Sequence, residues 1–427
     1  MRETTGAGVL RKASWRLLPL LGLGYGVAYM DRVNIGFAAL RMNRDLHFSA
    51  TVYGLGAGLF FLSYAAFEAP SNLLLARFGA RRWISRIMLT WGLLASAMMF
   101  VRTPLEFYGL RFLLGLAEAG FFPGVIYYLT LWFPVAHRGK AISRFYVAWP
   151  ISTVVMGAVA GTLLNLSGVW GLAGWQWLFL IEGIPALILS LIMFLMLPDG
   201  PDEARWLLPQ ERALLRESLD ADITLGAPEL GFRRILLQPA MLALGAANFL
   251  ILGSFYAFNL SAPAYLTGAT GLGAAHVGYV VAASGVLGAA AMLLAGWSSD
   301  RTGERYLHLA IPLILMACAF AVMSQSHSPR LVIGAFLAAA TFNAAVGGVF
   351  WLAPVPFLSP RSAALGLAVI NAVGQTGSFL LPWLWGVARD HTGSYRSGLT
   401  ALPAGFLIAA MLALYLRRRA QEVRHAG

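Results

Sequence analysis

Long apolar segments alternate with short polar ones along the whole chain. Each apolar segment is long enough to cross the roughly 30 Å of hydrocarbon in a bilayer as a helix. A longer polar stretch after the sixth segment separates two groups of six. The pattern therefore predicts twelve membrane-spanning helices, at residues 16–40, 51–76, 84–102, 106–132, 139–166, 175–197, 240–265, 275–299, 306–325, 331–354, 361–388 and 397–417.

The polar stretch between the two groups is expected to form a hinge with one short amphipathic helix and no catalytic group. It starts with two prolines close together, Pro198 and Pro201, and carries the longest charged run of the chain. The sequence thus predicts an N-terminal tail, a first six-helix bundle, a central loop, a second six-helix bundle and a C-terminal tail. Their expected limits are residues 1–15, 16–197, 198–238, 239–417 and 418–427.

Two similar turns indicate an internal repeat. Residues 76–81 follow the second predicted span and residues 300–305 follow the eighth, with Gly79 and Gly303 at matching places 224 residues apart (303 − 79). Parallel halves of this kind, related by an axis along the membrane normal, are typical of transporters that rock two bundles around a midplane site. The predicted fold is an all-α integral membrane protein with two pseudo-symmetric six-helix bundles.

The composition agrees with a protein that crosses the membrane many times. Of its residues 59% are hydrophobic and 12% charged, against roughly 25% charged in a soluble domain. The net charge of +12 would indicate nucleic acid in a soluble protein, but here the basic residues gather beside alternate spans, as in cytoplasmic loops. We expect a monomer in the inner (plasma) membrane with both termini cytoplasmic, a lipid bilayer around it and no nucleic-acid partner. The residues that set this orientation are Arg11, Lys12, Arg16, Arg77, Arg81, Arg82, Arg86, Arg138, Lys140, Arg144, Arg301, Arg305, Arg417, Arg418 and Arg419.

Catalysis is not indicated by any motif of the chain. It contains no zinc-protease helix motif, no phosphate-binding lysine loop and no nucleophile elbow. The single cysteine, Cys318, excludes an intrachain disulfide and a cysteine-based metal site. Its place in an apolar run predicts a small core residue. We expect no enzyme, no catalytic residue, no metal and no cofactor.

Four ionisable residues lie inside predicted spans: Asp31, Arg32, Arg111 and Glu118. A charge at the centre of a membrane helix costs about 2.5–3.5 kcal/mol on insertion scales, so such residues usually face a cavity or a partner. Arg111 and Glu118 are seven residues apart and share one helix face, about 10 Å apart along the axis. The four residues indicate a path for a charged solute.

The first predicted span presents a polar face. Tyr25, Tyr29 and Arg32 recur at i, i+4 and i+7, which stacks them on one side of a helix, while Asp31 points about 100° away. Arginine offers a planar fork of donors that suits a carboxylate, so Arg32 and Arg111 together indicate an anionic, carboxylate-bearing solute.

Proton coupling follows from the charges. If Asp31 pairs with Arg32 and Glu118 pairs with Arg111, both pairs are neutral and both arginines are occupied. Protonation of an acid then frees its arginine for an anion, so that proton and anion favour each other's binding. The coupling ion predicted in this way is H⁺.

Several strings of residues resemble one protein family. The turn from Gly296 to Arg305 resembles the loop signature of the major facilitator superfamily, and five further strings resemble its anion:cation symporters, which carry organic anions. The similarity runs through all twelve predicted spans, in the family's order. Residues 29–82 are most similar to bacterial tartrate carriers, followed by carriers of phthalate and other aromatic acids. The five strings are residues 31–34, 67–72, 177–185, 197–201 and 370–374.

The resemblance implies roles for individual residues. Family members bind the substrate carboxylate with an arginine that Arg32 matches, and couple protons with acids that Asp31 and Glu118 match. Arg111 matches an arginine associated with the second acid; a structural ion pair is its alternative. Tyr64 matches a substrate contact, with core packing as its alternative. The expected substrate-binding set is Arg32, Tyr29, Tyr64, Arg111 and Asn371.

The loop signature also implies a gate of charges at the cytoplasmic ends of the second and eighth spans. Its second copy is intact, whereas the first has Ala76 where the superfamily usually has Asp and Asn72 where it has Gly. The charge latch of the cytoplasm-closed state is therefore expected to depend more on Asp300 than on its first-half counterpart. The expected gating residues are Arg77, Asp300, Arg301 and Arg305.

Other polar and aromatic residues in the spans have two interpretations each. Glu68, one turn beyond Tyr64, is equally a structural residue and a local selectivity or gating residue. Glu182 is expected to cap or bend its helix. Trp149 is expected to pack, but if it faces the pocket it favours a compact or flat acid.

We therefore expect a secondary active transporter that takes up a small organic anion, a tartrate-like hydroxy-dicarboxylate or related carboxylate, by proton symport and alternating access. Within transport, the alternatives are an aromatic-acid or sugar-acid symporter and a proton-independent exchanger or facilitator. The alternative outside transport is a transporter-like sensor, which would bind its ligand without turnover.

Overall fold

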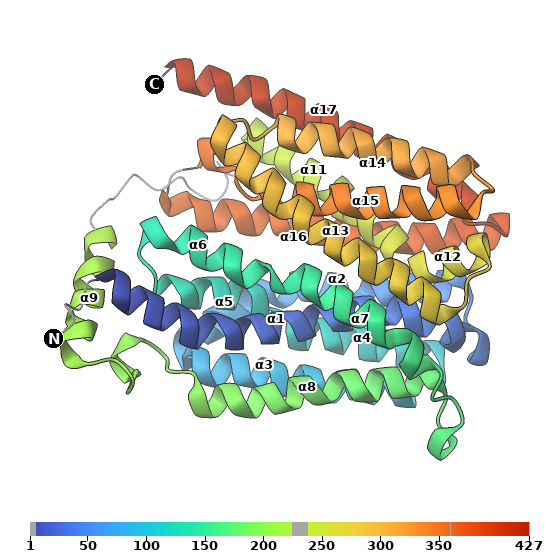
Figure 1. Ribbon diagram of the computed structural model, residues 1–427, viewed down its shortest axis with the longest axis horizontal. Helices are drawn as coiled ribbons and strands as arrows, with labels where there is room; N and C mark the ends of the chain where they lie inside the picture. Colours follow the sequence, from blue (N-terminus) through green and yellow to red (C-terminus); the bar gives the residue numbers. More distant parts are fainter. Residues whose placement is uncertain (1–5, 224–237, 359, 427) are drawn as a thin grey trace.

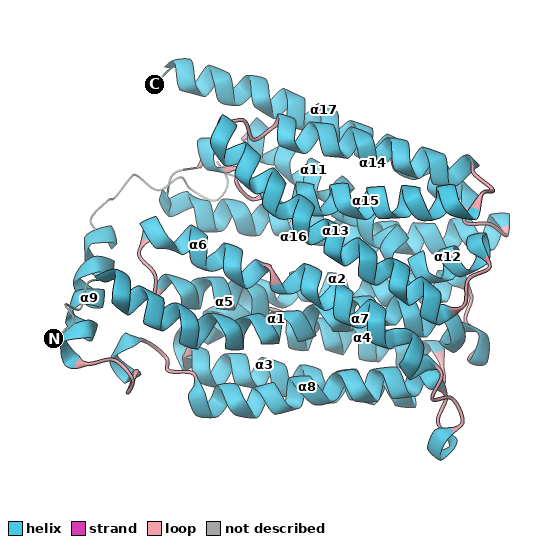
Figure 2. Ribbon diagram, in the orientation of Figure 1, coloured by secondary structure: helices cyan, strands magenta, loops and turns pink. Residues whose placement is uncertain are grey.

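The computed structural model describes residues 6–223, 238–358 and 360–426, and these residues form helices joined by short loops, without a strand (Figure 2). Parts of the predicted N-terminal tail and central loop, residues 1–5 and 224–237, lie outside the described residues. Eleven helical segments of the described chain are long and apolar enough to span a membrane. The remaining predicted span corresponds to α1 (Gly6–Asp45), a helix of 40 residues. The prediction of an all-helical membrane protein is confirmed.

The first half of the chain contains eight α-helices, several of which are parts of one predicted span. They are α1 (Gly6–Asp45), α2 (Ala50–Phe78), α3 (Ala80–Ala97), α4 (Pro104–Glu118), α5 (Phe121–Thr130), α6 (Val135–Tyr146), α7 (Ala148–Leu164) and α8 (Gly174–Met196). Short 3₁₀ turns, η1 (Met98–Phe100) and η2 (Val169–Gly171), lie in its loops.

The described part of the central loop contains the turn η3 (Pro201–Glu203) and the helix α9 (Pro209–Ile223). Lys12 forms an ion pair of 2.8 Å with Glu211, which ties α9 to the beginning of α1. The second half contains α11 (Pro239–Asn259), α12 (Ala262–Thr270), α13 (Ala274–Thr302), α14 (Leu307–Gln325), α15 (Pro329–Phe350), η4 (Val355–Phe357), α16 (Pro360–Thr392) and α17 (Arg396–Ala426).

Helix ends follow local sequence signals. Ser49 precedes α2 and accepts a hydrogen bond from the Val52 backbone N–H, and Thr103 and Glu106 form a reciprocal capping box at α4. Gly79, at φ +86°, makes the turn between α2 and α3, a conformation that side chains rarely adopt. The helices often extend beyond the predicted spans, because hydropathy marks only the part in hydrocarbon.

Within each half the helices pack side by side. In the first half α1 packs on α7 and α8, α2 on α4, and α3 on α8. In the second half α13 packs on α15, α14 on α15 and α17, and α11 on α16 and α17. The beginning of α1 and the end of α17 lie toward the same side of the molecule (Figure 1). The halves meet where α2 packs on α16 and α7 on α13.

Glycines bring the two halves together. A Cβ added to Gly157 of α7 would lie 2.5 Å from the carbonyl oxygen of Gly278 in α13, and one on Gly58 of α2 would lie 2.6 Å from that of Phe379 in α16. Only residues without a side chain permit such approach. These glycines therefore allow the helices of the two halves to cross closely.

Several hydrogen bonds between the halves lie near the turn that joins α1 to α2. The Tyr53 hydroxyl donates to the Leu260 carbonyl oxygen at 2.7 Å. Asp390, near the end of α16, accepts from the backbone N–H groups of Ala50 and Thr51 at 3.0 and 2.8 Å. The halves are thus bonded to each other at the end of the molecule opposite the beginning of α1.

Two local predictions are wrong. The predicted span 240–265 is interrupted between α11 and α12. The predicted span 106–132 corresponds to one segment able to cross the membrane, Pro104–Thr130, but its helix breaks between α4 and α5 at Gly120, whose φ is +86°. A Cβ on Gly120 would collide with the side chain of Ser71, so the break packs closely on α2. Cys318 is exposed rather than part of the core. An apolar run does not distinguish a face that meets lipid from one that meets other helices.

Candidate functional site

A cavity lies between the two halves, with an empty volume of about 830 Å³ that includes the part open to solvent. Among its described lining side chains, Arg32 alone carries a formal charge. The lining residues are Tyr25, Tyr29, Arg32, Tyr64, Phe122, Tyr146, Trp149, Asn248, Ile251, Leu252, Phe255, Tyr256, Asn343, Val346, Gly347, Phe350, Trp351, Asn371 and Gln375.

The first wall of the cavity is the polar face of α1. Tyr25, Tyr29 and Arg32 all line it, so the prediction that they share one face is confirmed. The rings of Tyr25 and Tyr29 lie 6.4 Å apart, and the Tyr29 ring lies 5.4 Å from that of Trp149. Trp149 therefore both lines the cavity and packs against Tyr29. These rings leave Arg32 between aromatic surfaces.

Arg32 is held by a buried acid. Its guanidinium forms an ion pair with Glu118, and its side chain is 11% exposed whereas that of Glu118 is fully buried. Its guanidinium carbon also lies 5.1 Å from the ring centre of Tyr64, within cation–π distance. Glu118 is the last residue of α4, directly before the break at Gly120. The interruption of this span thus places the carboxylate beside the cavity arginine.

The second arginine and second acid lie behind α1, away from the cavity. Asp31 is buried, accepts a hydrogen bond of 3.2 Å from the Asn34 amide, and has Arg111 as its strongest charged neighbour. Arg111 is 2% exposed and donates to the carbonyl oxygen of Ala57 at 3.4 Å. Arg111 is absent from the described lining, so the structure does not bring this predicted substrate-binding residue to the cavity.

The expected pairing of Asp31 with Arg32 and of Glu118 with Arg111 is wrong. Arg32 pairs with Glu118, and the charge of Arg111 acts on Asp31 more strongly than that of Arg32 does. Consecutive residues of a helix point about 100° apart, so Asp31 and Arg32 face different neighbours. Each of these four charges still has an opposite charge near it, as a low-dielectric interior favours.

The wall opposite α1 carries amides. Asn248 donates to the Ile370 carbonyl oxygen at 3.0 Å. The amide nitrogen of Asn371 donates to both carboxylate oxygens of Glu68, at 3.0 and 2.7 Å, and so joins α16 to α2. Tyr64 and Asn371 both line the cavity, as predicted for substrate contacts.

The sequence did not single out Val346, Gly347 and Phe350 in the wall formed by α15 and the residue that follows it. Asn343, Val346, Gly347, Phe350 and Trp351 all line the cavity. They recur at i, i+3, i+4, i+7 and i+8, which is one helix face. That spacing was the available signal, but it does not tell a cavity face from a packed one.

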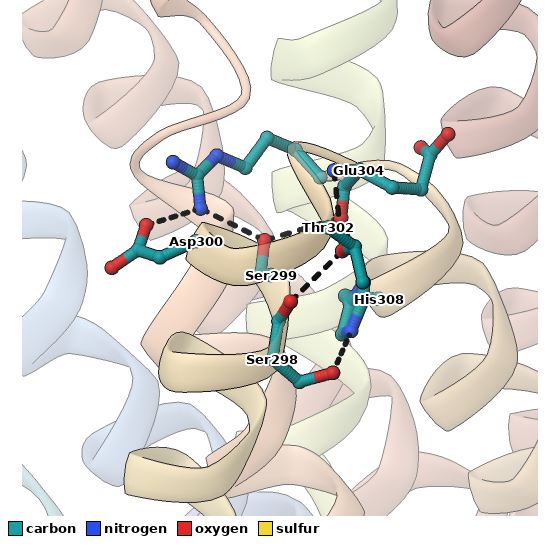
Figure 3. Close-up of polar contacts among 7 residues, drawn as sticks. Ser298, Ser299, Asp300, Thr302, Glu304 and His308 are labelled. Atoms are coloured by element: carbon teal, nitrogen blue, oxygen red, sulfur yellow. Dashed lines mark hydrogen bonds and ion pairs between the residues drawn. The ribbon is translucent and has the colours of Figure 1, made fainter.

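The predicted gating residues of the second half form a local cluster. Asp300 pairs with Arg305 at 2.6 Å, and the same guanidinium nitrogen donates to the Ser299 hydroxyl at 2.9 Å (Figure 3). Arg301 lies over the ring of Trp297 at 5.5 Å. The bonds of this cluster stay within the second half.

Glu304 extends this cluster to the last helix. Its carboxylate accepts from Arg417 at 3.0 Å and from the backbone N–H of Tyr306 at 3.1 Å, which caps the beginning of α14. Burial alone would raise the pKa of Glu304, but these hydrogen bonds and the charge of Arg417 outweigh it and lower the pKa.

The corresponding turn of the first half uses a different acid. Arg77 is exposed and its guanidinium carbon lies 5.7 Å from the ring centre of Phe78. The backbone N–H of Arg81 donates to Asp199 at 2.7 Å. Asp199 follows α8, so the acid at this turn comes from the end of the bundle and not from position 76.

Among the described residues, no three His, Cys, Asp or Glu side chains are grouped as a metal site.

The chain is similar to known transport proteins over nearly its whole length. Residues 21–382 match the family model described as Major Facilitator Superfamily. A protein of Agrobacterium vitis named "Putative tartrate transporter" is 42% identical, with 99% of this chain and 94% of that one covered. A protein of Acinetobacter baumannii named "Quinolone resistance transporter" is 40% identical, with 95% and 94% covered.

Among solved structures, a bacterial homolog of the human lysosomal transporter Spinster, in an inward-facing and unoccupied conformation, has a TM-score of 0.77. Its sequence is 19% identical, and 97% of this chain and 98% of that chain are covered. At that identity the likeness concerns the fold.

Proposed function

The chain belongs to the Major Facilitator Superfamily, a family of membrane transporters and not of enzymes, and we propose that it takes up a small organic anion by proton symport. The observation that carries the proposal is the ion pair between Arg32 and Glu118. It sets the one charged side chain of the described cavity lining against a buried acid at a helix break.

Glu118 and the substrate compete for the same guanidinium. With Glu118 ionised, the pair is neutral and Arg32 is occupied. With Glu118 protonated, Arg32 keeps its charge and offers its donors to a carboxylate in the cavity. An unpaired charge in a low-dielectric site is costly. States with only the proton or only the anion bound are therefore unfavourable, and the two bind and dissociate together.

Asp31 is the second proposed proton site. It lies on the far side of α1, next to Arg111, and touches the cavity through its neighbour Arg32 in the same helix turn. Protonation of Asp31 would leave the charge of Arg111 unbalanced, which disfavours the present packing of α1 and α4. In the proposal, the protonation of Glu118 is linked to substrate binding, and the protonation of Asp31 is linked to the position of the helices.

Alternating access follows from where the halves are bonded. The contacts of Tyr53 with Leu260 and of Asp390 with Ala50 lie at the end opposite the beginning of α1. With both termini in the cytoplasm, as the basic loops predict, this arrangement is the inward-facing state in the inner membrane. The gate cluster at Asp300 would then pair across the halves in the opposite state.

Uptake by proteoliposomes tests the proposal. Tartrate is the first compound to try because of the name of the Agrobacterium vitis relative, with phthalate and sugar acids beside it. An inward proton gradient is expected to drive accumulation above the external concentration, and a protonophore to abolish it. Equal uptake with and without the gradient would instead support an exchanger or facilitator, and binding without uptake would support a sensor.

A further inference from the structure

We propose that Glu68 sets the charge that the cavity accepts beside Asn371, so that the substrate carries one ionised carboxylate and an uncharged hydrogen-bonding group. This inference rests on the proposed function and names the substrate class of the same site.

Glu68 stands at the edge of the cavity beside a lining residue. Asn371 lines the cavity, and its amide nitrogen donates to both carboxylate oxygens of Glu68. Tyr64, one helical turn before Glu68 on α2, lines the cavity next to Arg32. Glu68 is half-buried. A carboxylate of the protein therefore already occupies the amide that a substrate would use.

The charges of the site leave no place for a second anionic group. Arg32 is the one charged residue in the described lining, and it serves the first carboxylate. Arg111, which sequence reasoning offered to a second carboxylate, is buried beside Asp31. A second carboxylate near Asn371 would meet the ionised Glu68 without a second arginine, and like charges repel strongly in a low-dielectric cavity.

A hydroxyl group fits the same place. It can donate to a carboxylate oxygen of Glu68 and accept from the Asn371 amide, so both protein groups keep a partner. A hydroxylated monocarboxylate thus satisfies Arg32 at one end and the Glu68–Asn371 pair at the other. The aromatic rings of Tyr29 and Trp149, which also line the cavity, suit its carbon chain.

Threonate and tartrate of matched configuration make the test, because they share one carbon chain and differ at one terminal carbon, a hydroxymethyl group in threonate and a carboxylate in tartrate. Labelled uptake into proteoliposomes gives kcat/KM for each. The wild type is expected to prefer threonate, and Glu68→Gln to shift the ratio toward tartrate by about tenfold or more, the effect of removing one repulsive interaction.

Matched variants separate charge from shape. Glu68→Asp keeps the charge and is expected to keep the preference for threonate, and Glu68→Ala is a second uncharged variant in case Glu68→Gln does not fold. Glu217→Gln, the same change at an exposed residue of α9, is expected to behave as the wild type.

The outcomes are distinct. An unchanged ratio in Glu68→Gln and Glu68→Ala, or an equal loss of both substrates, would overturn the role of Glu68 and leave proton-driven anion uptake standing. Failure of the wild-type protein to take up either compound or any other carboxylate tested would overturn the proposed function and this inference with it.

Discussion

The interiors of the two halves differ in charge although their helices are arranged alike. In the described chain, the buried charged side chains all lie in the first half and the central loop, whereas the buried polar side chains of the second half are serines, asparagines and one glutamine. The first half can thus change its charge when it binds a proton. The second half can only donate and accept hydrogen bonds.

This difference separates two tasks. Arg32 and Glu118 form an ion pair with each other, so in our proposal the half that binds the carboxylate also binds the proton. Asn248, Asn343 and Asn371 reach the same cavity from the other half, and in our proposal they orient the solute without a net charge. In this proposal, the binding of the proton and the binding of the anion are coupled within the first half, without a conformational change passed from one half to the other.

The largest expected effect comes from removing the cavity arginine. Arg32→Ala leaves Glu118 buried without its cation and the substrate carboxylate without donors. Breaking such a pair costs about 3–5 kcal/mol, more than a hundredfold in affinity. Uptake is expected to fall to background, whereas Arg418→Ala, an exposed arginine of α17, should keep wild-type rates. Measurable binding by Arg32→Ala would contradict the assignment.

Replacing the paired acid should separate the proton from the anion. In Glu118→Gln the competitor of the substrate is permanently neutral, so Arg32 stays available. We expect substrate exchange between the two sides of a proteoliposome to persist and gradient-driven accumulation to disappear. Counterflow and gradient-driven uptake measured on the same vesicles check this, with Glu217→Gln as the control. Full accumulation by Glu118→Gln would show that another group carries the proton.

A substitution in the second half should leave the proton untouched. Asn343→Ala removes one hydrogen-bonding group from the cavity wall, and a neutral hydrogen bond contributes about 0.5–1.5 kcal/mol. We expect KM to rise several-fold while the pH dependence of uptake keeps its wild-type midpoint. A shifted midpoint would mean that the amides take part in coupling, and the comparison between the halves would fail.

The smallest effect is expected at the turn between α13 and α14. Because the pKa of Glu304 is lowered in the folded protein, its contribution is present above the ordinary carboxyl pKa and is lost as the pH falls through the lowered value. The pair with Arg417 is partly exposed, so Glu304→Gln should cost at most about 1 kcal/mol. Thermal unfolding in detergent should show a small difference from the wild type at neutral pH that vanishes in acid.

Much of the site was predictable because its signals are local. The face formed by Tyr25, Tyr29 and Arg32 follows from helical periodicity alone, and the structure has it. The intramembrane acids Asp31 and Glu118 stand out against apolar neighbours. The break after Glu118 was not predicted, because Gly120 sits in an apolar stretch that hydropathy reads as one span. That break decides where the carboxylate points.

The sequence by itself determined which segments are apolar enough to enter the membrane and which of them carry charge, and it predicts their orientation, because hydropathy and the excess of basic residues are properties of each segment alone. The tertiary structure decided which acid meets which arginine, that Arg111 faces Asp31 and not the cavity, and that Glu68 bonds to Asn371, 303 residues away. Such pairings depend on the rotation and depth of packed helices, and a shift of one residue turns a side chain by about 100°.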